Sequence, residues 1–115
     1  MKNFLSKNSI TIRSKGNYHV LKFDLILFFE AVHHKTRIHY LNHTIQDIDV
    51  KLDEVELKLK NHSFWRSDLN YIIHLKYLEK VSGNDENNLL MKGDYRVPID
   101  ENRKHILLEE LAKIG

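Results

Sequence analysis

The sequence predicts a mainly β fold built from short antiparallel strands. Three polar segments, residues 14–17, 82–85 and 92–94, each contain one of the internal glycines. Gly and Asn adopt positive φ angles at low cost, so these segments are typical of hairpin turns. The segments between the turns alternate apolar and polar residues, which is the pattern of strands with one buried face. Together, these two observations indicate consecutive β-hairpins.

The predicted strands follow one another along most of the chain. The segment 25–32 is too apolar for an exposed edge, which predicts a strand inside a sheet. In the segment 44–50, Ile45 is out of phase with Ile48 and Val50, which predicts a bulge or a change of face. In order, the predicted strands are 9–13, 18–23, 25–32, 36–42, 44–50, 75–82, 88–91 and 95–99.

Two segments have the apolar spacing of helices. Leu52, Val55 and Leu59 follow an i, i+3, i+7 pattern, with acidic residues early and lysines late, as the helix dipole favours. A second helix, near the C-terminus, is predicted by the spacing of Leu107, Leu111 and Ile114.

Capping residues bear on the C-terminal helix and on residues 67–73. Asp100 is a candidate N-cap for the C-terminal helix. The structure of residues 67–73 is ambiguous, because Ser67 or Asp68 could cap a short helical turn.

Length and composition predict one domain. A chain of 115 residues with 42% hydrophobic and 30% charged residues can bury one core. We expect residues 1–8 to form an N-terminal leader and residues 9–115 to form the domain. No segment approaches the roughly 20 apolar residues of a membrane span, and the N-terminus lacks the apolar core of a signal peptide. The absence of cysteine excludes disulfides and thiolate zinc sites and is compatible with a cytoplasmic protein.

The sequence contains no recognised catalytic or cofactor-binding motif. It has no Gly-rich loop that could cradle a phosphate and no Gly-x-Ser-x-Gly nucleophile elbow. We therefore expect no enzymatic activity, no cofactor, no metal and no small-molecule substrate. His74 follows three apolar or aromatic residues, and we expect it to be partly buried and hydrogen-bonded. Four other histidines lie close together without the spacing of a zinc site, namely His33, His34, His39 and His43.

The charges are segregated along the chain, although the formal net charge is only +2. The residues before Asp24 include five fixed positive charges and no acid. The stretch between Glu30 and Asp47 contains Lys35, Arg37 and four histidines, again without an acid. Unless this clustering arose by chance, it predicts a basic face of the kind that binds phosphate groups.

Four segments, in order, resemble a known family. Residues 25–31 read LILFFEA, residues 52–59 read LDEVELKL, residues 64–75 read FWRSDLNYIIHL and residues 95–100 read YRVPID. Their order and spacing resemble the bacterial LytTR DNA-binding domain over nearly the whole chain. The resemblance implies three small antiparallel sheets with two or three short helices. It also implies that loops along one side enter successive grooves of DNA.

The function implied by this resemblance is that of a bacterial transcription regulator that binds specific sequences in double-stranded DNA. A homodimer on paired half-sites is expected, because one small module gives modest specificity. No receiver domain is present in the sequence, so the chain is either cut from a response regulator or a protein that works alone. Arg37, Arg103 and Lys104 would anchor phosphates, while His34 and Asn70 would reach base edges. The full set of implied DNA contacts is His33, His34, Lys35, Arg37, Ser67, Asn70, Asn102, Arg103 and Lys104.

Some positions depart from the family pattern. Asp68, Leu69, Asn70 and His74 stand where the family usually has His, Arg, Ser and Asn, and an Asp100–Glu101 pair stands where it often has Ser-Arg. An acid near a phosphate is repelled, although a carboxylate can accept a hydrogen bond from cytosine N4. The alternative function is therefore a LytTR-like fold that acts as a protein-interaction module and modulates another regulator.

Overall fold

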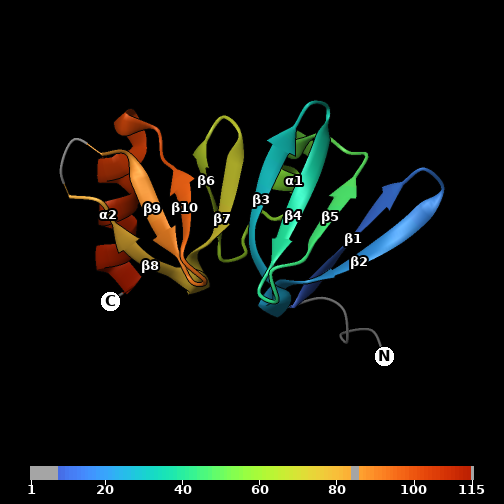
Figure 1. The fold of residues 1–115 in the computed structure, drawn as a ribbon, viewed down its shortest axis with the longest axis horizontal. Coiled ribbons are helices and arrows are strands. Elements are labelled where there is room, and N and C mark those ends of the chain that lie inside the picture. Colours follow the sequence, from blue (N-terminus) through green and yellow to red (C-terminus); the bar gives the residue numbers. More distant parts are fainter. Residues whose placement is uncertain (1–7, 84–85, 115) are drawn as a thin grey trace.

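The computed structural model describes residues 8–83 and 86–114. Within these residues the chain forms ten strands, two α-helices and three short 3₁₀ helices in an elongated domain of 45 × 32 × 25 Å (Figure 1). The elements are β1 (Ser9–Ser14), β2 (Asn17–Lys22), η1 (Phe23–Leu25), β3 (Ile26–Val32), β4 (Lys35–Tyr40), β5 (Ile45–Ile48), α1 (Leu52–Lys58), β6 (Phe64–Asp68), β7 (Tyr71–His74), η2 (Leu75–Tyr77), β8 (Leu78–Val81), β9 (Asn88–Met91), β10 (Tyr95–Pro98), η3 (Glu101–Arg103) and α2 (Lys104–Ile114).

A five-stranded antiparallel sheet forms the centre of the domain, in the order β5-β4-β3-β7-β6. The middle strand, β3, pairs with β4 on one side and with β7 on the other. Its first four residues are buried, which confirms the prediction of an internal strand. The β1–β2 hairpin forms a two-stranded sheet, and β10-β9-β8 form a three-stranded sheet. The mainly β fold with three small sheets is therefore confirmed.

The two faces of the central sheet are covered by different layers, which produces two core clusters. Phe29 and Ile72 belong to the first cluster, together with Val55 of α1 and residues of β1 and β2. Phe28 and Ile73 belong to the second cluster, together with residues of β9, β10 and α2. Neighbouring residues of one strand point to opposite faces, so β3 and β7 contribute to both clusters.

The hairpin formed by β6 and β7 corrects the possibility of a helical turn at residues 67–73. The two strands pair from Phe64 to His74, with a register shift between Arg66 and Asp68. The Asp68 carboxylate accepts a hydrogen bond of 2.7 Å from the backbone N–H of Asn70. Asp68 therefore closes a hairpin turn in the way that Asx residues do and caps no helix.

Three predicted strands differ from the structure by more than one or two residues or in their local geometry. The segments 18–23 and 75–82 were expected to be strands throughout, but η1 begins at Phe23 and η2 occupies residues 75–77. The segment 44–50 contains only the short strand β5, and its pairing with β4 has no register shift. Ile45 is exposed whereas Ile48 is buried. The two residues are an odd number apart, so an ordinary strand places them on opposite faces.

The predicted turns and helices agree with the structure where it describes them. The turns at residues 14–17 and 92–94 connect β1 to β2 and β9 to β10. Part of the turn at residues 82–85 lies outside the described residues. Helix α1 covers most of the predicted segment, and α2 begins before the predicted apolar spacing. Asp100 was expected to cap the C-terminal helix; it caps η3, which directly precedes α2, because its carboxylate accepts a hydrogen bond of 3.0 Å from Asn102 N–H.

Candidate functional site

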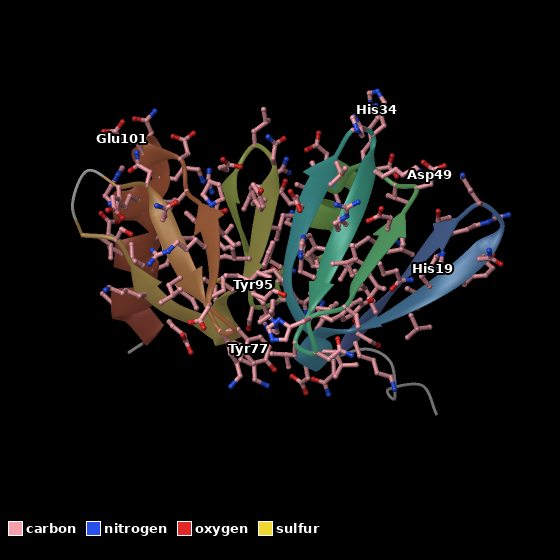
Figure 2. The ribbon with its side chains drawn as sticks, viewed as in Figure 1. His19, His34, Asp49, Tyr77, Tyr95 and Glu101 are labelled. Atoms are coloured by element: carbon pink, nitrogen blue, oxygen red, sulfur yellow. The ribbon has the colours of Figure 1, made fainter. Side chains whose placement is uncertain are left out.

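One edge of the central sheet collects several of the loops that connect its strands. β3, β5 and β6 end at this edge, and β4 and β7 begin there, because neighbouring strands are antiparallel. The end of β10 joins the same edge through a hydrogen bond of 2.9 Å from Asp100 N–H to the Ser67 carbonyl. Figure 2 shows His34 and Glu101 on this side of the molecule. We call residues 33–35, 49–51, 68–70 and 99–103 the loop edge.

The tip of the β3–β4 hairpin presents three exposed polar side chains to this edge. His33 has a positive φ angle of 59°, which allows the tight turn between the strands. His33, His34 and Lys35 are all exposed. Imidazole N–H and ammonium groups can donate hydrogen bonds to phosphate oxygens and to acceptors on bases. This tip therefore has the chemistry of a nucleic-acid contact.

Arg37 lies in β4, one step behind the tip, and is paired within the sheet. Its Nε and Nη2 donate hydrogen bonds of 2.8 and 3.1 Å to the two carboxylate oxygens of Asp47, its partner on β5. These hydrogen bonds hold the pKa of the Asp47 carboxyl below its usual value. The charge of Arg37 is therefore offset by a neighbouring carboxylate at the position where a phosphate contact was expected.

The tip of the β6–β7 hairpin is fixed by backbone hydrogen bonds. Arg66 Nε donates a hydrogen bond of 2.9 Å to the Asp68 carbonyl, and Arg66 Nη2 donates a hydrogen bond to the Leu69 carbonyl. On the other side of the tip, the Asn70 carbonyl accepts a hydrogen bond of 2.8 Å from Ala31 N–H. The side chains of Leu69 and Asn70 are exposed at this fixed tip.

Arg66 is itself a structural residue. Its side chain is only 13% exposed, and Nη1 contacts carboxylate oxygens of Asp53 at 3.0 Å and Glu56 at 2.7 Å, both in α1. The fork of the guanidinium therefore connects α1 to the β6–β7 tip.

Ser67 does not reach the surface. Ser67 is 0% exposed, and its hydroxyl donates a hydrogen bond of 2.9 Å to the Pro98 carbonyl at the end of β10. Among the residues expected to contact DNA, Ser67 therefore holds two loops of the edge together and cannot touch a ligand in this conformation.

The turn before α2 contributes one exposed side chain from the expected set, Asn102. Arg103 is half-buried, with its guanidinium carbon 4.7 Å from the centre of the Trp65 ring and its Nε donating 3.0 Å to the Arg66 carbonyl. Lys104 Nζ donates a hydrogen bond of 2.9 Å to the Glu86 carbonyl. The two cations expected to bind phosphate here are therefore both engaged within the domain.

Three acidic residues on the loop edge, Asp49, Asp68 and Asp100, have partners within the chain. Asp68 and Asp100 accept hydrogen bonds from the backbone of their own turns. Asp49 lies 3.5 Å from Lys15 Nζ at the tip of the β1–β2 hairpin. These contacts explain why acids occur here, because turn-capping positions favour Asp. Glu101 is exposed at the turn that Asp100 caps.

Most other histidines take part in packing. His39 Nε2 lies 2.8 Å from Glu30 Oε1, and its ring stacks on Phe28. His74 is buried, as predicted, and its Nδ1 lies 2.9 Å from the Ile26 carbonyl oxygen. Burial lowers the pKa of the His74 imidazole. Across residues 8–83 and 86–114, no group of three or more His, Asp or Glu side chains is arranged to hold a metal ion.

The structure therefore divides the nine expected DNA contacts into three groups. Ser67 is buried, and Arg37, Arg103 and Lys104 are engaged in contacts within the domain. The five that are exposed along one edge are His33, His34, Lys35, Asn70 and Asn102.

Lys51 and Leu69 are exposed residues of this edge that were not among the expected DNA contacts. Lys51 lies between β5 and α1, and Leu69 lies at the β6–β7 tip. Lys51 could have been recognised as a lysine directly before a predicted helix, at the end of a predicted strand. Leu69 stands where the family usually has Arg, but it was not expected to contact DNA, because an isolated leucine is more often part of a core.

Comparison with known proteins agrees with this geometry. The sequence profile of the LytTr DNA-binding domain matches residues 16–112. A search of curated proteins found no match. Among solved structures, the chain is similar to the LytTr DNA-binding domain of a protein described as a methyl-accepting/DNA response regulator from Bacillus cereus. The similarity has a TM-score of 0.72 and 19% sequence identity, and it covers 92% of this chain and 98% of that one.

The part of the chain that the structure describes contains no helix that is long and apolar enough to cross a membrane. The family match covers most of the chain, and the expected fold is present. The chain belongs to the LytTR family of DNA-binding domains.

Proposed function

We propose that the loop edge binds specific sequences in double-stranded DNA and that the chain acts as a transcription regulator in the bacterial cytoplasm. The observation that carries the proposal is the gathering of His33, His34, Lys35, Asn70 and Asn102 as exposed polar side chains along one edge. They come from three loops that are far apart in sequence. A row of loops on a rigid sheet suits a long ligand with a repeating backbone.

The exposed residues divide into two chemical roles. Lys35 and Lys51 supply positive charge near the sheet and would pair with phosphates, which positions the protein without reading sequence. Asn70, Asn102 and His34 carry groups that can distinguish bases, since an Asn amide pairs with adenine N6 and N7 in the major groove. Sequence-specific binding would come from this second group.

Arg37 can assist although it is paired with Asp47. Nε and Nη2 serve the carboxylate, but a guanidinium has five N–H donors. The remaining donors can face a phosphate, with the attraction reduced by the nearby carboxylate. A small module of this kind gains specificity from paired half-sites, which supports a homodimer on DNA.

One observation favours the alternative function, a protein-interaction module that modulates another regulator. Glu101 and Asp49 are exposed on the same edge as the basic residues, and Figure 2 shows both on this side of the molecule. A mixed-charge edge suits a protein partner better than a uniform phosphate backbone does.

Salt-dependent binding tests the proposal. Fluorescence anisotropy would follow the chain on a labelled pool of random-sequence duplexes at about 50 mM and about 200 mM salt, because released counterions make DNA binding strongly salt-dependent. We expect Lys35→Ala to weaken binding and to reduce the salt slope by about one. A matched control is Lys92→Ala, an exposed lysine in the β9–β10 turn at the opposite end of β10.

The outcomes separate the two functions. Equal losses in Lys35→Ala and Lys92→Ala would show that the loop edge is not the binding surface. If no duplex binds at the lower salt concentration, DNA binding is excluded for this chain, and the protein-interaction function takes its place.

A further inference from the structure

We propose that Leu69 contacts the C5 methyl group of a thymine in the major groove and thereby makes the β6–β7 tip selective for an A·T pair. The inference rests on the proposed DNA binding by the loop edge, and it assigns part of the sequence preference to one apolar side chain.

The exposure of Leu69 is the first observation. Leu69 is 80% exposed, more than any other large hydrophobic residue among those that the structure describes. An apolar side chain in water contributes little to folding, since stabilisation follows the area removed from water. Leu69 therefore has no packing role within this domain that would explain its position.

The rigidity of the tip is the second observation. Arg66 binds the carbonyl groups of both Asp68 and Leu69, and the Ala31 N–H binds the carbonyl of Asn70. These contacts hold the backbone on both sides of the leucine. A side chain presented by a fixed backbone loses less conformational entropy when it binds, so even a small apolar contact can improve affinity.

The chemistry of the neighbouring residue indicates the ligand. Asn70 is exposed directly beside Leu69, and an Asn amide can bind adenine N6 and N7. An A·T pair presents these adenine atoms and the thymine methyl group on the same major-groove edge. The Leu69–Asn70 pair therefore matches one apolar and one polar feature of a single base pair or of two adjacent ones.

Leu69 also lacks charge, which makes its contribution separable from that of the lysines. Neutralising phosphates releases counterions and sets the salt slope, whereas an apolar contact with a methyl group releases none. Leu69→Ala should therefore lower affinity while the salt slope stays unchanged. Because the side chain is so exposed, we expect the variant to fold and to melt like the original chain.

The test uses duplexes in which single thymines are replaced by deoxyuracil, which removes only the methyl group. A binding duplex would first be enriched from a random-sequence library with the full chain. We expect deoxyuracil at one thymine position to weaken binding about fourfold, the effect of one buried methyl-sized group. In Leu69→Ala the same replacement should have no effect. The control Leu25→Ala removes a half-exposed leucine next to the opposite end of β3 and should keep the deoxyuracil effect.

Two results would overturn the inference. One of them leaves the proposed function intact, and the other contradicts it as well. If enriched duplexes bind with a steep salt dependence but deoxyuracil affects the original chain and Leu69→Ala equally, Leu69 does not read the methyl group and the proposed function stands. If the library yields no binding duplex at low salt, the proposed function and this inference fail together.

Discussion

The Ser67 hydroxyl donates a hydrogen bond of 2.9 Å to the Pro98 carbonyl, and this partly buried contact joins the end of β6 to the end of β10. The Asp100 N–H completes the joint by donating to the Ser67 carbonyl at 2.9 Å. The two strands belong to different sheets. The Arg103 Nε also donates a hydrogen bond of 3.0 Å to the Arg66 carbonyl, so the Ser67 hydroxyl is one of three contacts that set the spacing between the β6–β7 tip and the turn before α2.

Replacing Ser67 by alanine should loosen this joint. The Pro98 carbonyl would lose a buried donor, so we expect the free energy of unfolding to fall by about 1–2 kcal/mol. DNA affinity should also fall modestly, because Asn70 and Asn102 would be held less firmly at their spacing by the two remaining hydrogen bonds, while the salt slope should stay the same. Urea unfolding and anisotropy measure the two effects. Ser63→Ala, at an exposed serine, should change neither, and an unchanged Ser67→Ala would show that the joint is dispensable.

Replacing Arg66 by lysine should destabilise the domain although the charge is kept. An ammonium group cannot serve Asp53, Glu56 and the two backbone carbonyls at once, because it lacks the planar fork of the guanidinium. Most of the loss should come from the carbonyl contacts, since exposed ion pairs contribute little. We expect a loss of about 1–3 kcal/mol in urea unfolding.

Hydrogen exchange can locate the effect of that substitution. The amide N–H of Ala31, which donates to Asn70 across the tip, should exchange faster in Arg66→Lys. The matched control is Glu56→Gln, which removes one exposed ion-pair partner and leaves the backbone contacts intact. Equal exchange rates in the two variants would contradict a special role for the guanidinium.

The sequence predicted most of the strands and the described turns because their signals are local, but it did not predict β6, and β7 fell in an ambiguous segment. Alternating residues and glycine-containing turns depend on neighbours within a few positions. The segment 67–73 was ambiguous because Asp68 caps a hairpin turn as readily as a helix. The resemblance to the LytTR family supplied the three-sheet arrangement, which the residue pattern alone did not.

The accessibility of the expected site residues was less predictable, for a physical reason. Ser67, Arg103 and Lys104 are polar residues in or near loops, so the sequence indicated surface contacts. Their partners, Pro98, the Arg66 carbonyl and the Glu86 carbonyl, lie 18 to 37 residues away. A contact over that separation is visible only in the fold. The same holds for Leu69, whose exposure depends on the tip that Arg66 fixes.

Acidification should destabilise the domain through His74. Burial lowers the pKa of this imidazole below its ordinary value of 6.5. As the pH falls, His74 therefore takes up a proton in the unfolded chain before it does so in the folded chain. Stability should therefore be constant above about pH 7 and should fall between about pH 6.5 and the lower pKa of the folded state, by at most about 1.4 kcal/mol per pH unit. Urea unfolding at several pH values measures this slope.

A substitution isolates the histidine from other groups. His74→Asn keeps an N–H donor for the Ile26 carbonyl but removes the titration, so its stability should be lower overall and flatter with pH in this window. Asp24, whose carboxyl pKa is lowered by its hydrogen bond with Lys76, titrates only at more acidic pH. The assignment to His74 would be contradicted by an equal pH slope in both proteins.

Replacing Asp47 by asparagine should strengthen DNA binding. The carboxylate now occupies two donors of Arg37 and offsets its charge, so its removal frees a full positive charge behind the β3–β4 tip. We expect higher affinity at low salt and a salt slope steeper by about one, since one more phosphate can be neutralised. The matched control is Asp24→Asn, because Asp24 also pairs with a cation, Lys76 at 2.8 Å, but precedes the opposite end of β3. Both variants raise the net charge equally, so a gain confined to Asp47→Asn would place the bound phosphate beside Arg37. Equal gains would mean that only the overall charge affects binding, which would contradict a phosphate contact at the loop edge.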